Sequence, residues 1–240
     1  MNGNFRAALA LSIAIVLASL IASAAFLKAK RLDQTIRVTG SAKERIKSDL
    51  MIWRTSVTVE ATKLPDAYAR LAHDVDQVQA FLVSQGFQRN QIVISAIGTT
   101  QLRRQAKDGG ADSSVVGYQL RQSLEIRSQE IDKLTTVSRN VTQLITRGIF
   151  LESEQPQYLY TRLAEVKLAM LSEAAADAHR RAERMVGGSG AKVGEMRSAE
   201  MGVFQITAAN VDDVSGSGIN DTTSVEKDVA AVVHMTFAVD

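Results

Sequence analysis

Hydrophobic positions in this chain follow two different spacings, which divide most of it into strands and helices. Segments 34–40, 50–61, 91–102, 116–127, 149–160, 192–207 and 229–239 have strand character, and the alternation of apolar and polar residues is most regular over 116–127 and 229–239. Apolar residues recur three and four apart over 64–82, 131–145 and 161–186, the spacing of helices with one buried face. The order, roughly β-β-α-β-β-α-β-α-β-β, predicts an α+β fold in which helices pack on one face of a single antiparallel sheet.

Glycine and proline mark several of the expected ends and contacts. Pro65 suits the first turn of the first helix, and Gly86 and Gly148 suit the ends of the first two helices. Gly40 lies inside a strand and predicts a bulge or a close backbone contact. Pro156 is expected to interrupt the strand over 149–160. The Ala-rich third helix is expected to direct one set of residues inward: Leu163, Val166, Met170, Ala174, Ala178 and Met185.

The soluble part is expected to form one domain over residues 32–240. A ββα unit occurs twice within it, over 34–86 and 91–148, and predicts an internal duplication, although no repeated residues support it. The polar segment 43–49 is compatible with either a continued strand or a hairpin loop. Residues 103–114 are expected to form a hairpin loop, and residues 210–224, rich in Asp, Ser, Gly and Asn, a long loop.

The N-terminal segment has the composition of an export signal. No charged residue occurs from Ala7 to Leu27, and about 20 apolar residues in a helix span a bilayer core of about 30 Å. We therefore expect residues 1–31 to be an uncleaved signal anchor, a single transmembrane helix, with residues 32–240 exported. The alternative is a cleaved signal peptide, for which the small residues of the segment Ala22–Ala24 are suitable.

A stripe of small residues runs through the same segment. It consists of Ala10, Ala14, Ala18 and Ala22. A spacing of four predicts a face on which membrane helices pack closely, although export segments are Ala-rich in any case.

Composition excludes some classes of partner. Hydrophobic residues make up 45% and charged residues 22%, the values of an ordinary globular protein. A formal net charge of +2 and an aromatic content of 5% give no basis for a nucleic-acid partner. The absence of cysteine permits an oxidising compartment without requiring one.

No residue pattern predicts an active site, a metal site or a cofactor. His73, His179 and His234 are far apart in sequence, and no spacing among them is that of metal ligands. The acidic neighbours of His73 are expected to be solvated on a helix surface, as are the carboxylates of Glu152 and Glu154 on a strand. The Gly-Ser-Gly segment at 188–190 follows a helix and is interpreted as its stop.

The order of several short motifs resembles that of the SIMPL domain family. The opening strand pair, VTGSAKERIKSDLMIWRTSVTVEA (38–61), is similar to the start of that family, where V-x-G-x-A/G precedes an acidic residue and an apolar strand. The segments FLVSQGF followed by QIVIS, GYQLRQSLEIRS and the closing VAAVVHMTFAVD also match. The apolar N-terminus and SDLMIW resemble the membrane-anchored bacterial branch. The resemblance covers residues 35–240.

This resemblance implies an exported protein without catalytic residues. Some bacterial members assemble into large ring- or cage-like homo-oligomers, and links to oxidative stress have been proposed for the family. We therefore expect a non-enzymatic, membrane-anchored periplasmic scaffold that self-assembles, with a periplasmic protein-binding adaptor or holdase as the alternative. Residues of the two polar loops are candidates for binding a protein partner: Arg103, Arg104, Lys107, Asn210, Asp212 and Asp213.

Overall fold

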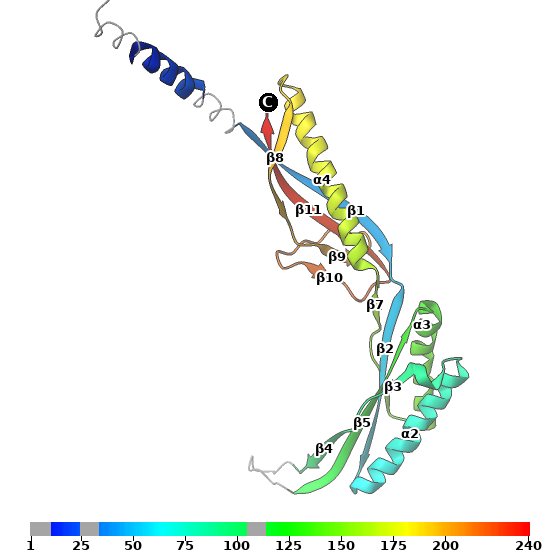
Figure 1. Cartoon of the computed structure of the whole chain (residues 1–240). Helices are drawn as coiled ribbons and strands as arrows, with labels where there is room; N and C mark the ends of the chain where they lie inside the picture. Colours follow the sequence, from blue (N-terminus) through cyan, green and yellow to red (C-terminus); the bar gives the residue numbers. More distant parts are fainter. Residues whose placement is uncertain (1–10, 25–33, 105–113) are drawn as a thin grey trace, which may run out of the picture.

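The computed structural model describes residues 11–24, 34–104 and 114–240. Beyond the N-terminal helix, the chain forms an elongated molecule with two lobes placed end to end (Figure 1). We call residues 50–159 the inserted lobe, and residues 35–47 with 163–239 the terminal lobe, because the second contains both the first and the last strand. The structure is α+β. The prediction of a single sheet is wrong, since each lobe has its own sheet and its own buried core.

The inserted lobe contains most of the short elements. They are β2 (Leu50–Ala61), α2 (Leu64–Ser84), η1 (Arg89–Gln91), β3 (Ile92–Ile94), β4 (Gly98–Arg103), β5 (Val115–Ser128), α3 (Ile131–Asn140), η2 (Val141–Arg147), β6 (Leu151–Ser153) and β7 (Gln157–Leu159).

Its strands lie in the order β3-β5-β2-β6, with β4 also beside β5 and β7 also beside β2, and every pair is antiparallel. Two strand–helix–strand units, β2-α2-β3 and β5-α3-β6, therefore interlock in one sheet, the ferredoxin-like arrangement. Both α2 and α3 lie on the same side of this sheet (Figure 1).

The spacing of apolar residues predicted the core of this lobe well. Four apolar residues of β2 are at most 4% exposed: Met51, Trp53, Val57 and Val59. Pro65 lies in the first turn of α2, and Gly86 and Gly148 follow helices with φ of 88° and 82°, as predicted. Tyr68 and Ile145 follow the apolar spacing of segments 64–82 and 131–145 but are 57% and 50% exposed.

The terminal lobe is one sheet with one long helix. Its elements are β1 (Thr35–Lys47), α4 (Leu163–Gly187), β8 (Val193–Met201), β9 (Gln205–Ala208), β10 (Ile219–Asn220) and β11 (Glu226–Val239). The strands lie in the order β1-β11-β9-β10, and β8 pairs with the end of β11 beyond β9.

Segment 43–49 continues the first strand rather than forming a hairpin. β1 runs to Lys47 and pairs along its full length with β11, whereas β2 enters the other sheet. The internal ββα duplication stays a prediction, and its first unit is divided between two sheets.

Helix α4 packs on the terminal sheet through a stripe of small and aliphatic residues. The buried set recurs every four residues: Val166, Met170, Ala174, Ala178, Ala182 and Val186. Met185, predicted to point inward, is 64% exposed because the stripe continues through the neighbouring position. The alanines bring the helix backbone onto β1 at Gly40, where a Cβ would overlap the Ala174 carbonyl oxygen and lie 2.5 Å from Ala178 N. Gly40 therefore marks a close backbone contact, as predicted.

The prediction of a transmembrane helix is wrong. The structure describes a helix over residues 11–24 of the N-terminal segment. Within the described ranges no helix is long and apolar enough to cross a membrane.

Replacing Gly40 by alanine tests the contact between α4 and β1. The added methyl group meets helix backbone, which cannot move aside as a flexible side chain does. We expect Gly40→Ala to lower the free energy of unfolding by about 3 kcal/mol in urea denaturation. Gly187→Ala is the matched control: nothing lies within 4 Å of a Cβ there, and a change of less than about 1 kcal/mol is expected. Equal effects of the two substitutions would contradict this account of the packing.

Candidate functional site

The three histidines lie far from one another, and each has different surroundings. His73 is exposed on α2. His179 Nε2 lies 3.5 Å from a Glu183 carboxylate oxygen, and its ring meets Phe237 edge-on at 5.3 Å between ring centres. His234 Nδ1 lies 3.0 Å from the Thr39 hydroxyl. Within the described residues, no three His, Asp or Glu side chains are grouped so that they could hold a metal ion.

One acidic residue near His73 differs from its prediction. Asp74 was expected to be solvated but is 7% exposed, and its Oδ2 has no hydrogen-bond partner. Arg70 Nε is 3.9 Å from that oxygen, so the charge is only loosely balanced. The spacing from Leu71 to Asp74 and on to Val78 is three and four residues, and it already placed Asp74 on the inner face of the helix.

The residues proposed for membrane packing and for one binding loop are only partly described. Ala14, Ala18 and Ala22 are exposed on the N-terminal helix, and Ala10 lies outside the described residues. Arg103 ends β4 and donates to Gln101 Oε1 at 2.9 Å. Arg104 N donates to the Ser114 carbonyl oxygen at 3.1 Å, which closes the base of the predicted hairpin. Lys107 lies outside the described residues.

The second predicted loop is fastened to the terminal sheet. Asp228 of β11 is 2% exposed and accepts hydrogen bonds from Arg45 Nε at 2.8 Å and from Asn210 N at 2.9 Å. Lys43 Nζ lies 3.3 Å from Asp228 and 2.6 Å from Asp212. Asp213 is exposed. The Asn210 side chain also accepts a hydrogen bond from the Arg45 guanidinium at 2.7 Å, so Asn210 and Asp212 both contact cations of β1, while the Asp212 side chain stays 86% exposed. Binding of a partner by this loop stays a prediction.

These contacts shift the ionisation of Asp228. The hydrogen bond from the Arg45 guanidinium, helped by the Asn210 N–H and the Lys43 ammonium, holds the pKa of the Asp228 carboxyl well below its usual range, against the opposing effect of burial. The carboxylate is therefore charged in the folded state at any ordinary pH, and it anchors the loop as an ion.

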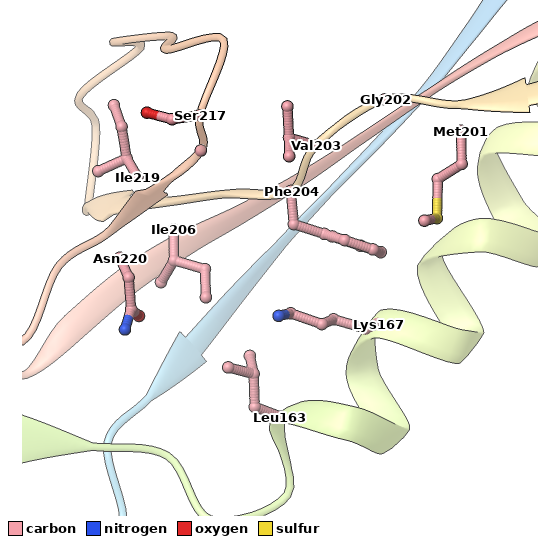
Figure 2. A pocket seen from close by; sticks show the side chains of 11 residues that line it. Leu163, Lys167, Met201, Gly202, Val203, Phe204, Ile206, Ser217, Ile219 and Asn220 are labelled. Atoms are coloured by element: carbon pink, nitrogen blue, oxygen red, sulfur yellow. The ribbon is translucent and has the colours of Figure 1, made fainter.

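A cavity of about 460 Å³ opens between the start of α4 and the segment that joins β8 to β10 (Figure 2). Apolar side chains predominate among the residues that line it, with polar groups between them. The lining residues are Leu163, Lys167, Met201, Gly202, Val203, Phe204, Ile206, Ser217, Gly218, Ile219 and Asn220. Lys167 extends from α4 into this space, and its ammonium lies 5.2 Å from the centre of the Phe204 ring. The sequence analysis did not predict this site. The only local signal is the spacing of four residues between Leu163 and Lys167, which places both on one side of the helix.

Two glycines shape the wall of the cavity. Gly218 has φ of 84°, and a Cβ there would lie 3.0 Å from the Phe204 carbonyl oxygen. A Cβ on Gly202 would lie 3.2 Å from the Val232 carbonyl oxygen. The loop therefore approaches the strands closely only because both positions lack a side chain.

A second cavity, about 220 Å³, lies where the two lobes meet. Ile46, Leu50 and Leu159 contribute apolar walls, and the buried side chain of Lys227 contributes a charge. Lys227 Nζ donates to the Asp221 main-chain oxygen at 2.7 Å and lies 3.3 Å from its carboxylate. Burial lowers the pKa of Lys227, while Asp221 opposes that shift.

The terminal sheet presents two open strand edges. Among the described residues, β1 and β8 each pair only with β11. Seven of the nine residues of β8 are exposed, and they include Met196 at 55% and Met201 at 61%. Such an edge offers unpaired backbone N–H and C=O groups to another strand.

Comparison with known proteins identifies the family. The sequence matches the family described as SIMPL, a protein of unknown function (DUF541), over residues 36–237. The chain belongs to the SIMPL family. No curated protein matches the sequence. The family assignment predicted from the order of short motifs is confirmed, and it brings no known activity to this SIMPL chain.

Likenesses to solved structures are weak. An amidase of the hydantoinase/carbamoylase family from Burkholderia phymatum shares 11% identity over 54% of this chain and 34% of its own, with a TM-score of 0.29. An uncharacterized conserved protein from Listeria innocua shares 10% identity over 82% and 92%, with a TM-score of 0.20. The SIMPL chain spans about a third of the length of the first of these, and neither score supports a shared fold or activity.

Replacing Asp228 by asparagine tests its role as the anchor of the loop. The pKa of Asp228 is lower in the folded state than its unfolded value of about 3.9, so the carboxylate stabilises the fold above about pH 4 and this stabilisation is lost as the pH falls further. We expect Asp228→Asn to cost about 1–2 kcal/mol at neutral pH, with a difference from wild type that shrinks below about pH 4.

The measurement is the free energy of unfolding in urea across this pH range. Asp213→Asn, on the same loop but exposed, is the control and should follow the wild type throughout. A difference between Asp228→Asn and wild type that persists unchanged at the lowest pH would show that the carboxylate charge is not the anchor.

Proposed function

We propose that this SIMPL chain is a non-enzymatic scaffold whose copies pair edge to edge through the terminal sheet into a ring- or cage-like homo-oligomer. The observation that carries the proposal is the open edge of β8, a nine-residue strand exposed on both faces. Soluble proteins usually shorten, cover or charge such edges, because an open edge recruits further strands.

The opposite edge of the same sheet is formed by β1. Its Ser41 N–H already donates to Asp177 Oδ2 at 3.0 Å, so helix α4 covers the middle of this edge. Main-chain N–H groups alternate in direction along a strand, so those of Arg37 and Thr39 point away from β11 as that of Ser41 does. The first half of β1 therefore offers a short edge to a second strand.

The two edges differ in charge. The first half of β1 contains one basic residue, Arg37, and no acidic residue, whereas β8 contains two acidic residues and one basic residue. Opposite charges favour the pairing of β8 in one copy with β1 in the next over the pairing of like edges. Contacts between two different surfaces generate a closed ring when the rotation between copies closes.

A second candidate uses the same edge. An extended peptide of another protein would add to β8 as a further strand, and the chain would then be a binding adaptor or holdase. The two functions differ in one measurable property, which is the mass of the purified chain in the absence of any partner. The location in the periplasm and the link to stress remain predictions.

Charge substitutions at Met196 test the pairing. In the proposed assembly β8 lies beside the first half of β1 of the next copy, which contains Arg37 and no acidic residue. Met196→Lys should therefore reduce the particle to the 26.0 kDa protomer at micromolar concentration, and Met196→Glu should leave it assembled. Native mass spectrometry and sedimentation velocity measure both. Met185→Lys, a methionine of similar exposure on α4, is the control and should assemble as wild type does.

Other outcomes separate the alternatives. Dissociation by both Met196→Lys and Met196→Glu would indicate that β8 of one copy pairs with β8 of a second copy across a two-fold axis, because either substitution then places two like charges together. A wild-type chain that stays a protomer at micromolar concentration would overturn the scaffold and favour the adaptor.

A further inference from the structure

The cavity beside α4 contains a cation without a counter-charge. Among the ion pairs of the described residues none involves Lys167, although other cations of the terminal lobe, such as Lys43, Arg45 and Lys227, are paired with carboxylates. Its ammonium lies over the Phe204 ring, an arrangement that holds a cation in place without neutralising it. The unbalanced positive charge points into the cavity (Figure 2).

The remaining lining determines what kind of anion fits. Leu163, Phe204 and Ile206 are apolar, and the Asn220 side chain adds an amide donor. A phosphate carries more than one negative charge and is usually held by several cations or N–H groups, whereas this cavity has one lysine. A carboxylate matches a single ammonium, and the Ser217 hydroxyl and the Asn220 amide are further donors in the lining.

The size of the space indicates that the ligand has an apolar part. A cavity of about 460 Å³ lies within the usual range of about 300–1,000 Å³ for small-molecule sites, and it is much larger than a carboxylate alone requires. Leu163, Ile206 and Asn220 also line the smaller cavity between the lobes, so the two spaces adjoin. The apolar walls of that second space would receive the far end of a chain.

We propose that the SIMPL domain binds an aliphatic carboxylate, with its head on Lys167 and its tail along Leu163, Phe204 and Ile206 toward the cavity between the lobes. The tail buries apolar surface, and the head balances the ammonium. This site does not depend on the pairing of strand edges, since Lys167 and Phe204 belong to one copy of the chain.

Decanoate below its micelle concentration is the probe, and isothermal titration calorimetry of the full chain is the measurement. We expect one saturable site per chain, with about fourfold tighter binding for each methylene from octanoate to decanoate. Lys167→Met should weaken decanoate binding at least about tenfold, because a charge-assisted hydrogen bond is lost. Lys167→Arg keeps the charge and should retain most of the binding.

A matched control comes from the inserted lobe. Lys133 lies over the Phe87 ring at 4.7 Å, a similar pairing of a lysine with a phenylalanine outside any proposed site. Lys133→Met should bind decanoate as wild type does. The unfolding curves of both methionine variants show whether each is folded.

Three results would overturn the proposal. They are equal binding of decanoate by folded Lys167→Met and wild type, acetate binding as tightly as decanoate, and decyltrimethylammonium binding as tightly as decanoate. The first would exclude Lys167 as the recognition group, the second would leave the apolar walls without a role, and the third would exclude recognition of a negative charge.

Discussion

The pairing of the first strand with the last one is the constraint on which the terminal lobe depends. Thirteen residue pairs join β1 to β11, from Thr35 with Ala238 to Lys47 with Glu226. β11 is also the strand that β8 and β9 pair with, so the whole sheet is built around the final residues of the chain. Contacts between residues so distant in sequence close a very long loop, which costs chain entropy and slows folding. The sheet therefore forms only when both its first and its last strand are present.

Two neighbouring residues of β11 hold the long loop at both of its ends. Lys227 and Asp228 are both 2% exposed. Successive side chains of a strand point to opposite faces of the sheet, so these two residues bind opposite ends of segment 210–224. Lys227 binds Asp221, and Asp228 binds the Asn210 N–H. Buried charges are tolerated here because each is paired within hydrogen-bond distance. The same loop provides one wall of the cavity at Lys167, so these polar contacts shape the site.

Local periodicity predicted the elements but not their partners. The helices were found because a buried stripe repeats every three or four residues, and β5 because polar and apolar residues alternate along it. Whether β1 pairs with β2 or with β11 depends on contacts across the chain, and no local pattern contains that information. The single-sheet prediction failed for this reason. Met185 was predicted to be buried because the expected stripe included a step of three residues. The observed stripe keeps a spacing of four and reaches Val186 instead, so the two differ only in the last turn of the helix.

The site was less predictable than the fold. Asp212 was chosen as a candidate because it lies in a polar loop, and its contact with Lys43 of β1, about 170 residues earlier, could not be foreseen. In the sequence Lys167 is one of many charged residues of a helix, and its contact with the Phe204 ring is visible only in the folded chain. Such juxtapositions arise from tertiary structure alone. The glycine at position 40 is the exception, since its lack of a side chain inside a strand already indicated a close neighbour.

The inserted lobe begins and ends at adjacent points. Leu50, its first residue, is the strand partner of Leu159, its last, and the Asp49 carboxylate accepts hydrogen bonds from Thr161 just beyond. A segment whose two ends are neighbours is exchangeable: lengthening, shortening or replacing it leaves the ends of the surrounding sheet where they were. Evolution can therefore remodel the outer half of this molecule while the half that holds the open edges and the lysine stays unchanged.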